Sequence, residues 1–145
     1  MSLALWLTAC LAQPTPEPTA TPRKPFTISP GDNPYAPKPN DKNLQRANVV
    51  MTTINLIERF DLDPSQVEVD LQGSMPSTCN ELRVNIDLPN DNYQILMEVY
   101  SVILPLAKCE NVFQQFNTSV LLGIYSPGRY TVWVNQGKVG DFISQ

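Results

Sequence analysis

The chain contains no histidine, only six glycines in 145 residues, and only 17% charged residues. Histidine is the commonest general base and the commonest metal ligand, so its absence removes both and excludes the usual catalytic triads. The sequence also lacks a Ser-x-x-Lys motif and a glycine-rich phosphate-binding loop. We therefore predict a protein that is not an enzyme and that uses neither a metal nor another cofactor.

Basic residues are also few. Ten lysines and arginines stand against fourteen acids, which gives a net charge of −4. In residues 43–145 the bases are scattered singly: Arg46, Arg59, Arg83, Lys108, Arg129 and Lys138. Phosphate backbones are bound by clustered bases that displace counterions. The charge pattern therefore predicts no nucleic-acid partner.

Proline, in contrast, is abundant and clustered. Nine of the 14 prolines fall between residues 14 and 39. Such a segment cannot bury enough apolar area to offset the entropy lost on ordering, so we predict a disordered linker over residues 11–43. Prolines at this spacing favour the polyproline II conformation, in which thirty-odd residues at about 3.1 Å each span at most roughly 100 Å. The linker is suited to be a stalk.

The amino end carries a targeting signal. Residues 3–9 are mostly apolar, and Leu7-Thr8-Ala9-Cys10 resembles the bacterial lipobox, L-x-[small]-C. The resemblance implies that residues 1–10 are a signal segment, that Cys10 carries lipid, and that the chain is held on a membrane outside the cytoplasm. The alternative is an apolar terminus with a stray cysteine. The apolar run is too short to span a bilayer, which needs about 20 residues.

Residues 44–145 show the period-two alternation of apolar and polar residues that is typical of strands with one buried face. The predicted strands cover residues 49–60, 66–72, 81–88, 93–104, 113–122, 129–135 and 138–143. Segment 49–60 also has helical spacing, but six of its twelve residues are β-branched, which favours a strand. Ser126-Pro127-Gly128 and Asn135-Gln136-Gly137 are turn signals, and Gly140 predicts a bulge.

About seven strands in roughly 100 residues are typical of an immunoglobulin-like antiparallel β-sandwich. A small β-barrel is the alternative. Cys79 and Cys109 are an even pair in a chain that we expect to be exported, so we predict a disulfide between them. A reactive thiol is the other interpretation, but no histidine or cationic cluster is present to lower its pKa.

Residues 71–82 resemble a G-x-[LM]-P-x-x-C-x-x-L segment found in small uncharacterised bacterial envelope lipoproteins. Gly73, Met75, Pro76 and Cys79 carry the resemblance. Residues 128–137 resemble the closing hairpin of the same proteins, G-x-Y-x-V-x-V-N-G, with one extra residue before the last glycine. The resemblance implies structural motifs and no particular activity. The Gly-x-Tyr element also resembles a tyrosine corner, which implies a role in folding for Tyr130.

Few side chains are left as candidates for a site. Asp61 and Asp63, and the run from Asp87 to Asn92, are oxygen-rich, but they fit solvated turns better than calcium loops. Trp133 and Tyr100 lie on the faces of their strands opposite the predicted core. They are candidates for a binding surface, or else they pack beneath other elements.

We therefore expect a lipid-anchored, extracytoplasmic binding or accessory domain. Its partners would be the membrane, through the lipid on Cys10, and a protein or glycan. The alternative is a secreted protease-inhibitor-like module, which would present residues 104–113 or 123–128 to an active site.

Overall fold

The computed structural model describes residue 21 and residues 23–145, and it is almost entirely β-structure. In chain order the elements are β1 (Thr27–Pro30), the 3-10 turn η1 (Pro39–Asn43), β2 (Gln45–Ala47), β3 (Val50–Arg59), β4 (Gln66–Met75), β5 (Glu81–Ile86), β6 (Gln94–Ile103), β7 (Gln114–Leu121), β8 (Gly123–Tyr125), β9 (Gly128–Val134) and β10 (Gly137–Ser144). All seven strands predicted from the alternation are present, including β3 in the ambiguous segment.

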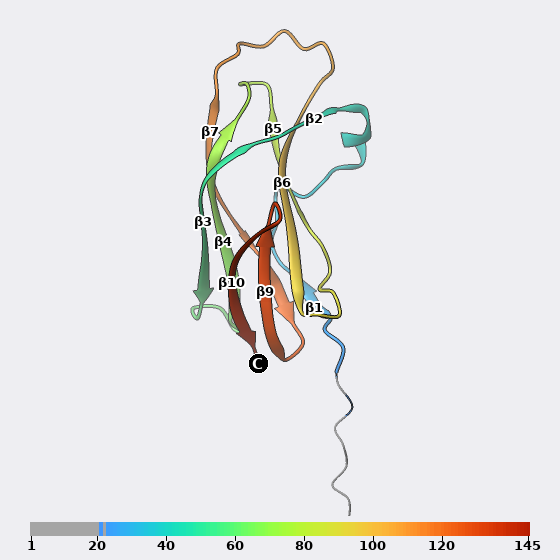
Figure 1. Ribbon diagram of the computed structural model, residues 1–145, viewed down its shortest axis with the longest axis vertical. Coiled ribbons are helices and arrows are strands. Elements are labelled where there is room, and N and C mark those ends of the chain that lie inside the picture. Colours follow the sequence, from blue (N-terminus) through green and yellow to red (C-terminus); the bar gives the residue numbers. More distant parts are fainter. Residues whose placement is uncertain (1–20, 22) are drawn as a thin grey trace, which may run out of the picture.

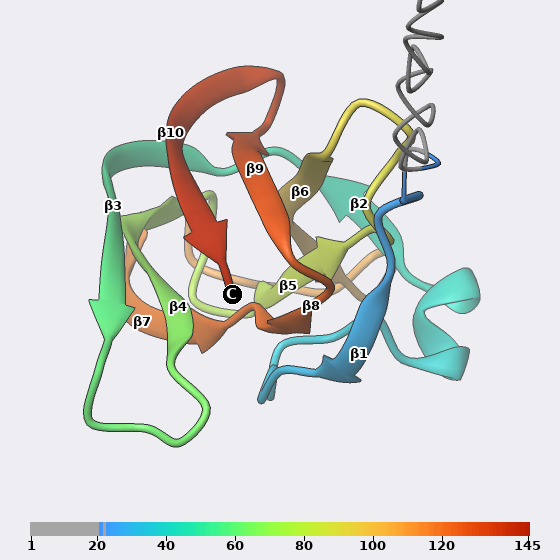
Figure 2. The same ribbon diagram turned by 90° about the horizontal axis from the view of Figure 1, so that it is seen from below.

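The strands form three sheets that pack as a sandwich-like fold around one core. One sheet has the order β10-β9-β6-β2, with β5 paired to the other side of β6, and the second has the order β3-β4-β7. The third is the short pair β1-β8. In the end-on view of Figure 2, β3, β4 and β7 lie on one side of the core and β10, β9 and β6 lie across from them.

The core comes from the inward-facing members of each alternation. β4, β6 and β9 contribute most of it, each through residues two apart. The buried apolar side chains on these strands are Val67, Val69, Leu71, Met75, Ile95, Met97, Val99, Val102, Tyr130, Val132 and Val134. Side chains alternate between the two faces of a strand, so the residues between these buried ones face outward. The buried residues of β6 therefore determine which of its residues form the outer face.

One pairing departs from the predicted antiparallel arrangement: β6 pairs with β9 in parallel, from Gln94↔Thr131 to Met97↔Val134. The side chain of Asn135 continues this ladder. Its Oδ1 accepts from the Val99 N–H at 2.8 Å, and its Nδ2 donates to the Val99 carbonyl at 3.0 Å. An asparagine amide thus replaces the next peptide unit of β9, where the hairpin has already turned away.

The β9–β10 hairpin closes through a two-residue turn at Asn135 and Gln136. Both residues have positive φ, 46° and 70°, as a type I′ turn requires. The register shifts between Lys138 and Gly140, so the bulge predicted at Gly140 is confirmed. Gln136, the extra residue relative to the G-x-Y-x-V-x-V-N-G motif, therefore fits within an ordinary two-residue turn.

The predicted disordered linker differs from the structure in its later part, where the chain is docked on the domain. β1 pairs with β8, and the N–H of Val84 donates to the carbonyl of Tyr35 at 2.8 Å, which extends the sheet beyond β5. Composition did not predict this, because prolines are tolerated on sheet edges, where the missing N–H would face solvent. Residues 26–43 thus belong to the folded unit.

Glycine allows β1 to approach β8. A Cβ on Gly31 would lie 1.8 Å from the carbonyl oxygen of Leu121, and Gly123 has a φ of +102°. Neither position has room for a side chain, and the second also needs a backbone conformation that other residues rarely adopt. These two glycines are the local sequence feature that makes the docking of β1 sterically allowed.

Tyr130 occupies the centre of the core as a tyrosine corner. Its side chain is fully buried, and its hydroxyl donates to the carbonyl oxygen of Ser126, four residues upstream, at 2.8 Å. The Ser126 hydroxyl lies 2.9 Å from the hydroxyl oxygen of Tyr130 and accepts from the N–H of Phe26. The corner therefore holds the β8–β9 turn and also connects it to the start of the docked segment.

Cys79 and Cys109 form the predicted disulfide, which joins positions 30 residues apart. Cys79 lies in the β4–β5 turn, where Ser77 Oγ donates to Asn80 Oδ1 and Asn80 Nδ2 donates to Ser101 Oγ at 3.0 Å. Cys109 lies in the long loop between β6 and β7 at one end of the molecule (Figure 1). The bridge thus fastens an irregular loop to a hydrogen-bonded turn.

We expect Tyr130→Phe to lower the free energy of unfolding by about 1–3 kcal/mol, because it leaves the Ser126 carbonyl without its buried donor. Urea denaturation followed by circular dichroism measures this change. Tyr100→Phe, on the outer face, is the matched control and should change the free energy little. Equal effects of the two substitutions would contradict the role of the corner.

We expect Cys79→Ser/Cys109→Ser to lose about 3–4 kcal/mol of stability, because a loop of this length is no longer closed in the unfolded chain. Denaturant unfolding of the wild type, measured with and without a reductant, and of the double variant gives the free energies to compare. Reduction should bring the wild type to the stability of the double variant. Free thiols at both cysteines in the untreated protein would contradict the disulfide.

Candidate functional site

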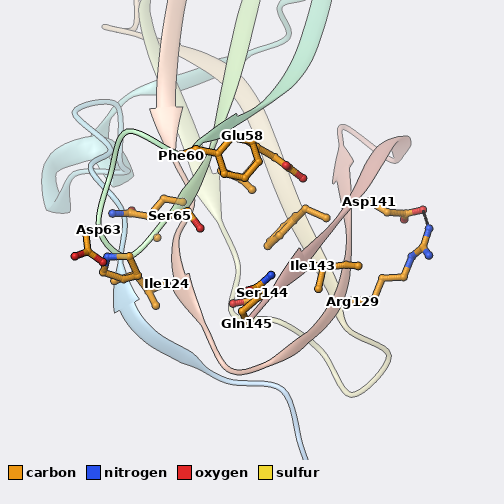
Figure 3. A pocket seen from close by; sticks show the side chains of 15 residues that line it. Glu58, Phe60, Asp63, Ser65, Ile124, Arg129, Asp141, Ile143, Ser144 and Gln145 are labelled. Carbon is orange, nitrogen blue, oxygen red and sulfur yellow. Dashed lines mark hydrogen bonds and ion pairs between the residues drawn. The ribbon is translucent and has the colours of Figure 1, made fainter.

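Two hollows on the surface of the described residues have volumes of about 570 Å³ or more. The first, of about 680 Å³, lies at the end of the molecule where β3 turns into β4 (Figure 3). Two of its polar side chains are paired within the fold: Thr131 Oγ1 donates to the Asp141 carboxylate at 2.8 Å, and Ser144 Oγ donates to the Tyr125 carbonyl at 2.7 Å. In Figure 3, Asp141 and Arg129 lie together, away from Phe60.

The environment of Asp141 explains its role in this hollow. Hydrogen bonds from Thr131 and Arg129 and the nearby Lys138 ammonium hold the pKa of the Asp141 carboxyl below its usual value. A carboxylate stabilised in this way is a weak proton acceptor and a structural ion-pair partner. We therefore interpret Asp141 as a structural residue of this hollow.

The second hollow is a groove of about 570 Å³ on the outer face of the sheet that contains β6. Trp133 of β9 and Tyr100 of β6 both line it, so the structure brings the two predicted surface aromatics together. β6 supplies the floor through Leu96, Glu98 and Tyr100, which alternate with three buried residues. The register of the parallel pair places Trp133 directly beside Leu96.

The walls of the groove come from two segments that are distant in sequence. The chain from β2 to β3 crosses above the tip of the β9–β10 hairpin (Figure 1), and this crossover contributes Asn48 and Val49. The hairpin tip contributes Gln136. The groove therefore exists because β2 and β3 belong to different sheets and the chain must pass from one to the other.

Arg46 determines how Tyr100 is presented. The central carbon of its guanidinium lies 3.7 Å from the centroid of the Tyr100 ring, and the same guanidinium forms an ion pair with Glu98. A cation above an aromatic face is attracted by the ring quadrupole. One face of Tyr100 is thus covered by Arg46, and the Glu98 carboxylate is partly neutralised.

Trp133 offers the larger aromatic surface. It is partly exposed on the outer face, beside Leu96, which is 42% exposed. Its indole Nε1–H is buried and has no hydrogen-bond acceptor among the described residues. A buried donor without an acceptor is unfavourable, and it is the one unsatisfied side-chain group of this kind in the described part of the chain.

Arg83 borders Tyr100 on the side of β5, because the two residues are register partners and share the outer face. The Arg83 side chain is only 4% exposed and donates to both oxygens of Asp41 in η1, at 2.8 and 2.9 Å. Hydrogen bonds from Arg83 and from the Lys38 N–H lower the pKa of Asp41 from 3.8 to about 2. This ion pair fixes η1 against the sheet beside the groove.

The other predicted sites are not brought together. Cys10 lies outside the described residues. Asp61 accepts hydrogen bonds from Arg59, and Asn90 Oδ1 accepts from the N–H groups of Asn92 and Gln94, so both oxygen-rich segments form turns. Among residues 21 and 23–145, no three acidic or cysteine side chains gather as a metal site. That same part of the chain holds no helix of the length and apolar character needed to cross a bilayer.

The two loops considered for protease inhibition differ in exposure. Residues 123–128 include β8 and are largely buried, with Tyr125 and Ser126 at the centre of the tyrosine corner. Residues 104–113 are exposed, and Leu106 at their tip is 99% exposed with a φ of +61°. Only the second loop is presented to solvent.

Sequence reasoning missed the contribution of Arg46. The outward positions of Leu96 and Glu98 follow from the alternation in β6, but Arg46 precedes the first predicted strand and carries no periodic signal. The groove combines aromatic faces, carboxylates and amides, which suits non-covalent recognition. Comparison with protein-family models, with curated proteins and with solved structures found no match to this chain.

We expect Asp41→Asn to lower the thermal midpoint by several degrees at pH 7, because Arg83 loses a charged partner. The folded-state pKa of Asp41 is depressed, so its contribution is complete above about pH 4 and is lost as the pH falls to about 2. Thermal melts of both proteins from pH 7 to pH 2 measure the difference, which should shrink over that window.

The matched control is Asp91→Asn, because Asp91 pairs with Lys24 and both side chains are 78% exposed. An exposed pair contributes little to stability. If Asp41→Asn and Asp91→Asn behaved alike at pH 7, the anchoring of η1 by Asp41 would be contradicted.

Proposed function

We propose that this protein is a lipid-anchored, extracytoplasmic binding domain whose ligand site is the groove between Trp133 and Tyr100. One observation carries the binding part of the proposal. Two aromatic residues 33 positions apart line one open groove. Clustered, partly exposed aromatic side chains with a polar rim are typical of recognition surfaces.

The anchoring part of the proposal has separate support. The lipobox-like Leu7–Cys10 sequence precedes the proline-rich stretch, and disulfides such as Cys79–Cys109 persist mainly in oxidising compartments. The first described residues reach the domain beside the start of β6, where the hydroxyl of Tyr93 donates a hydrogen bond to the carbonyl of Arg23. This entry lies at the opposite end of the molecule from the β6–β7 loop (Figure 1). A lipid on Cys10 would therefore hold the domain by one end.

A protease inhibitor is the second candidate. The exposure of Leu106, on a loop fastened by Cys109, is the observation in its favour. Its backbone turns at Leu106, however, because a φ of +61° is left-handed, and a segment bound in an active-site cleft like a substrate is extended. We therefore rank protease inhibition second, below ligand binding in the groove.

We expect the full chain, expressed in a bacterial host, to incorporate a palmitate analogue and to sediment with membranes. Cys10→Ala should remove the label and release the protein into the soluble fraction, because the acylated thiol is lost. The control, Cys79→Ser/Cys109→Ser, should keep the label. An unlabelled soluble wild type, or a label that persists in Cys10→Ala, would refute lipid anchoring at Cys10.

A further inference from the structure

We propose that the groove binds a neutral glycan, with a sugar ring against Trp133 and its hydroxyls bonded by Asp87, Glu98 and Asn48. The inference rests on the proposed function, since it names the ligand class of the same site. The residues come from three places: the β2–β3 crossover, the end of β5 with the start of its loop, and the outer face of β6 and β9.

The apolar part of the groove matches one face of a sugar ring. A pyranose carries C–H groups on its faces and hydroxyls around its edge. The negative face of an indole attracts such C–H groups, as it attracts other positively polarised groups. Leu96 and Val49 lie in the same groove and extend its apolar surface around Trp133. An elongated glycan could thus place one ring on the indole and continue toward Tyr100.

The polar part of the groove matches the hydroxyls. Asp87 and Asn48 are exposed, and Asp87 uses one oxygen to accept from Asn85 Nδ2 at 2.9 Å. The ionised carboxylate has lone pairs left to accept from ligand hydroxyls, and the Asn48 amide can both donate and accept. Glu98 is oriented by its ion pair with Arg46, which reduces the ordering that ligand binding would require.

The charge of the groove disfavours anionic ligands. Of the residues that the structure describes, Arg46 is the only base that lines it, and this guanidinium is already paired with Glu98 and stacked on Tyr100. A phosphate or sulfate group would find no free cationic clamp, and it would lie near Asp87. A cationic ligand would find one face of Tyr100 already covered by Arg46, although the Trp133 indole and Asp87 stay open to it. The charge of the groove thus disfavours anions, and we assign it a neutral ligand on the match of its apolar and hydrogen-bonding surfaces to a sugar.

The position of the groove disfavours an extended peptide. β6 is paired with β5 on one side and with β9 and β2 on the other, so its backbone groups are used. A peptide that adds to a sheet needs a free edge, and here only side chains face the ligand. A sugar ring needs no backbone pairing. A polyproline II peptide also needs none, so the experiment must distinguish such a peptide from a glycan as the ligand.

Trp133 provides its own reporter, because the chain has two tryptophans and the other is Trp6. The test uses the full chain with Cys10→Ala and Trp6→Phe, titrated with dextran, laminarin, galactomannan and soluble β-1,4-glucan oligosaccharides. We expect at least one glycan to shift the Trp133 emission and to retard the protein in affinity electrophoresis. Trp133→Ala and Tyr100→Ala should weaken that retardation at least tenfold, and Trp133→Phe should weaken it less.

Phe113→Ala is the matched control, since Phe113 is also an exposed aromatic but lies at the end of the β6–β7 loop, outside the groove. It should bind as the parent does, and thermal melts should show every variant folded. The glycan assignment is overturned if no polysaccharide retards the protein, or if Trp133→Ala and Phe113→Ala bind equally well. It is also overturned if only a peptide of residues 14–25 shifts the Trp133 emission. In that case the groove remains a binding site, and labelling at Cys10 still tests the anchor separately.

Discussion

The two-residue alternation of β6 from Ile95 to Val99 is the constraint on which both the core and the groove depend. Ile95, Met97 and Val99 are buried between the sheets, so Leu96 and Glu98 must face outward. A slip of one residue in register would exchange the two faces and destroy both. The Asn135 amide, which pairs with both backbone groups of Val99, holds β9 and therefore Trp133 in this register.

Local patterns were sufficient to predict most of the fold. Alternation identified the long strands, and the even cysteine pair identified the disulfide. The tyrosine corner at Tyr130 followed from a short motif. These features share a cause: each depends on the period of a strand or on a turn whose residue types are restricted by backbone geometry.

The features that were not predicted are non-local. The docking of residues 26–43 depends on Gly31 meeting the backbone of Leu121 and on Asp41 meeting Arg83, pairs that are far apart in the chain. The groove was predicted only as two separate surface aromatics, because Trp133 and Tyr100 line one groove only through the parallel β6–β9 pairing, which places Trp133 beside Leu96 on the outer face. Arg46 joins them only through the crossover between sheets. Patterns in a single sequence do not predict such contacts between distant residues.

The most direct test of the central claim is a heteronuclear NMR spectrum of the ¹⁵N-labelled full chain, recorded with and without the retarding glycan. We expect the indole N–H signal of Trp133 and the backbone amide signals of residues 96–100 to shift together, while those of residues 104–113 stay in place. Shifts confined to residues 104–113, with the Trp133 signal unchanged, would show that the ligand site is elsewhere and would contradict the account.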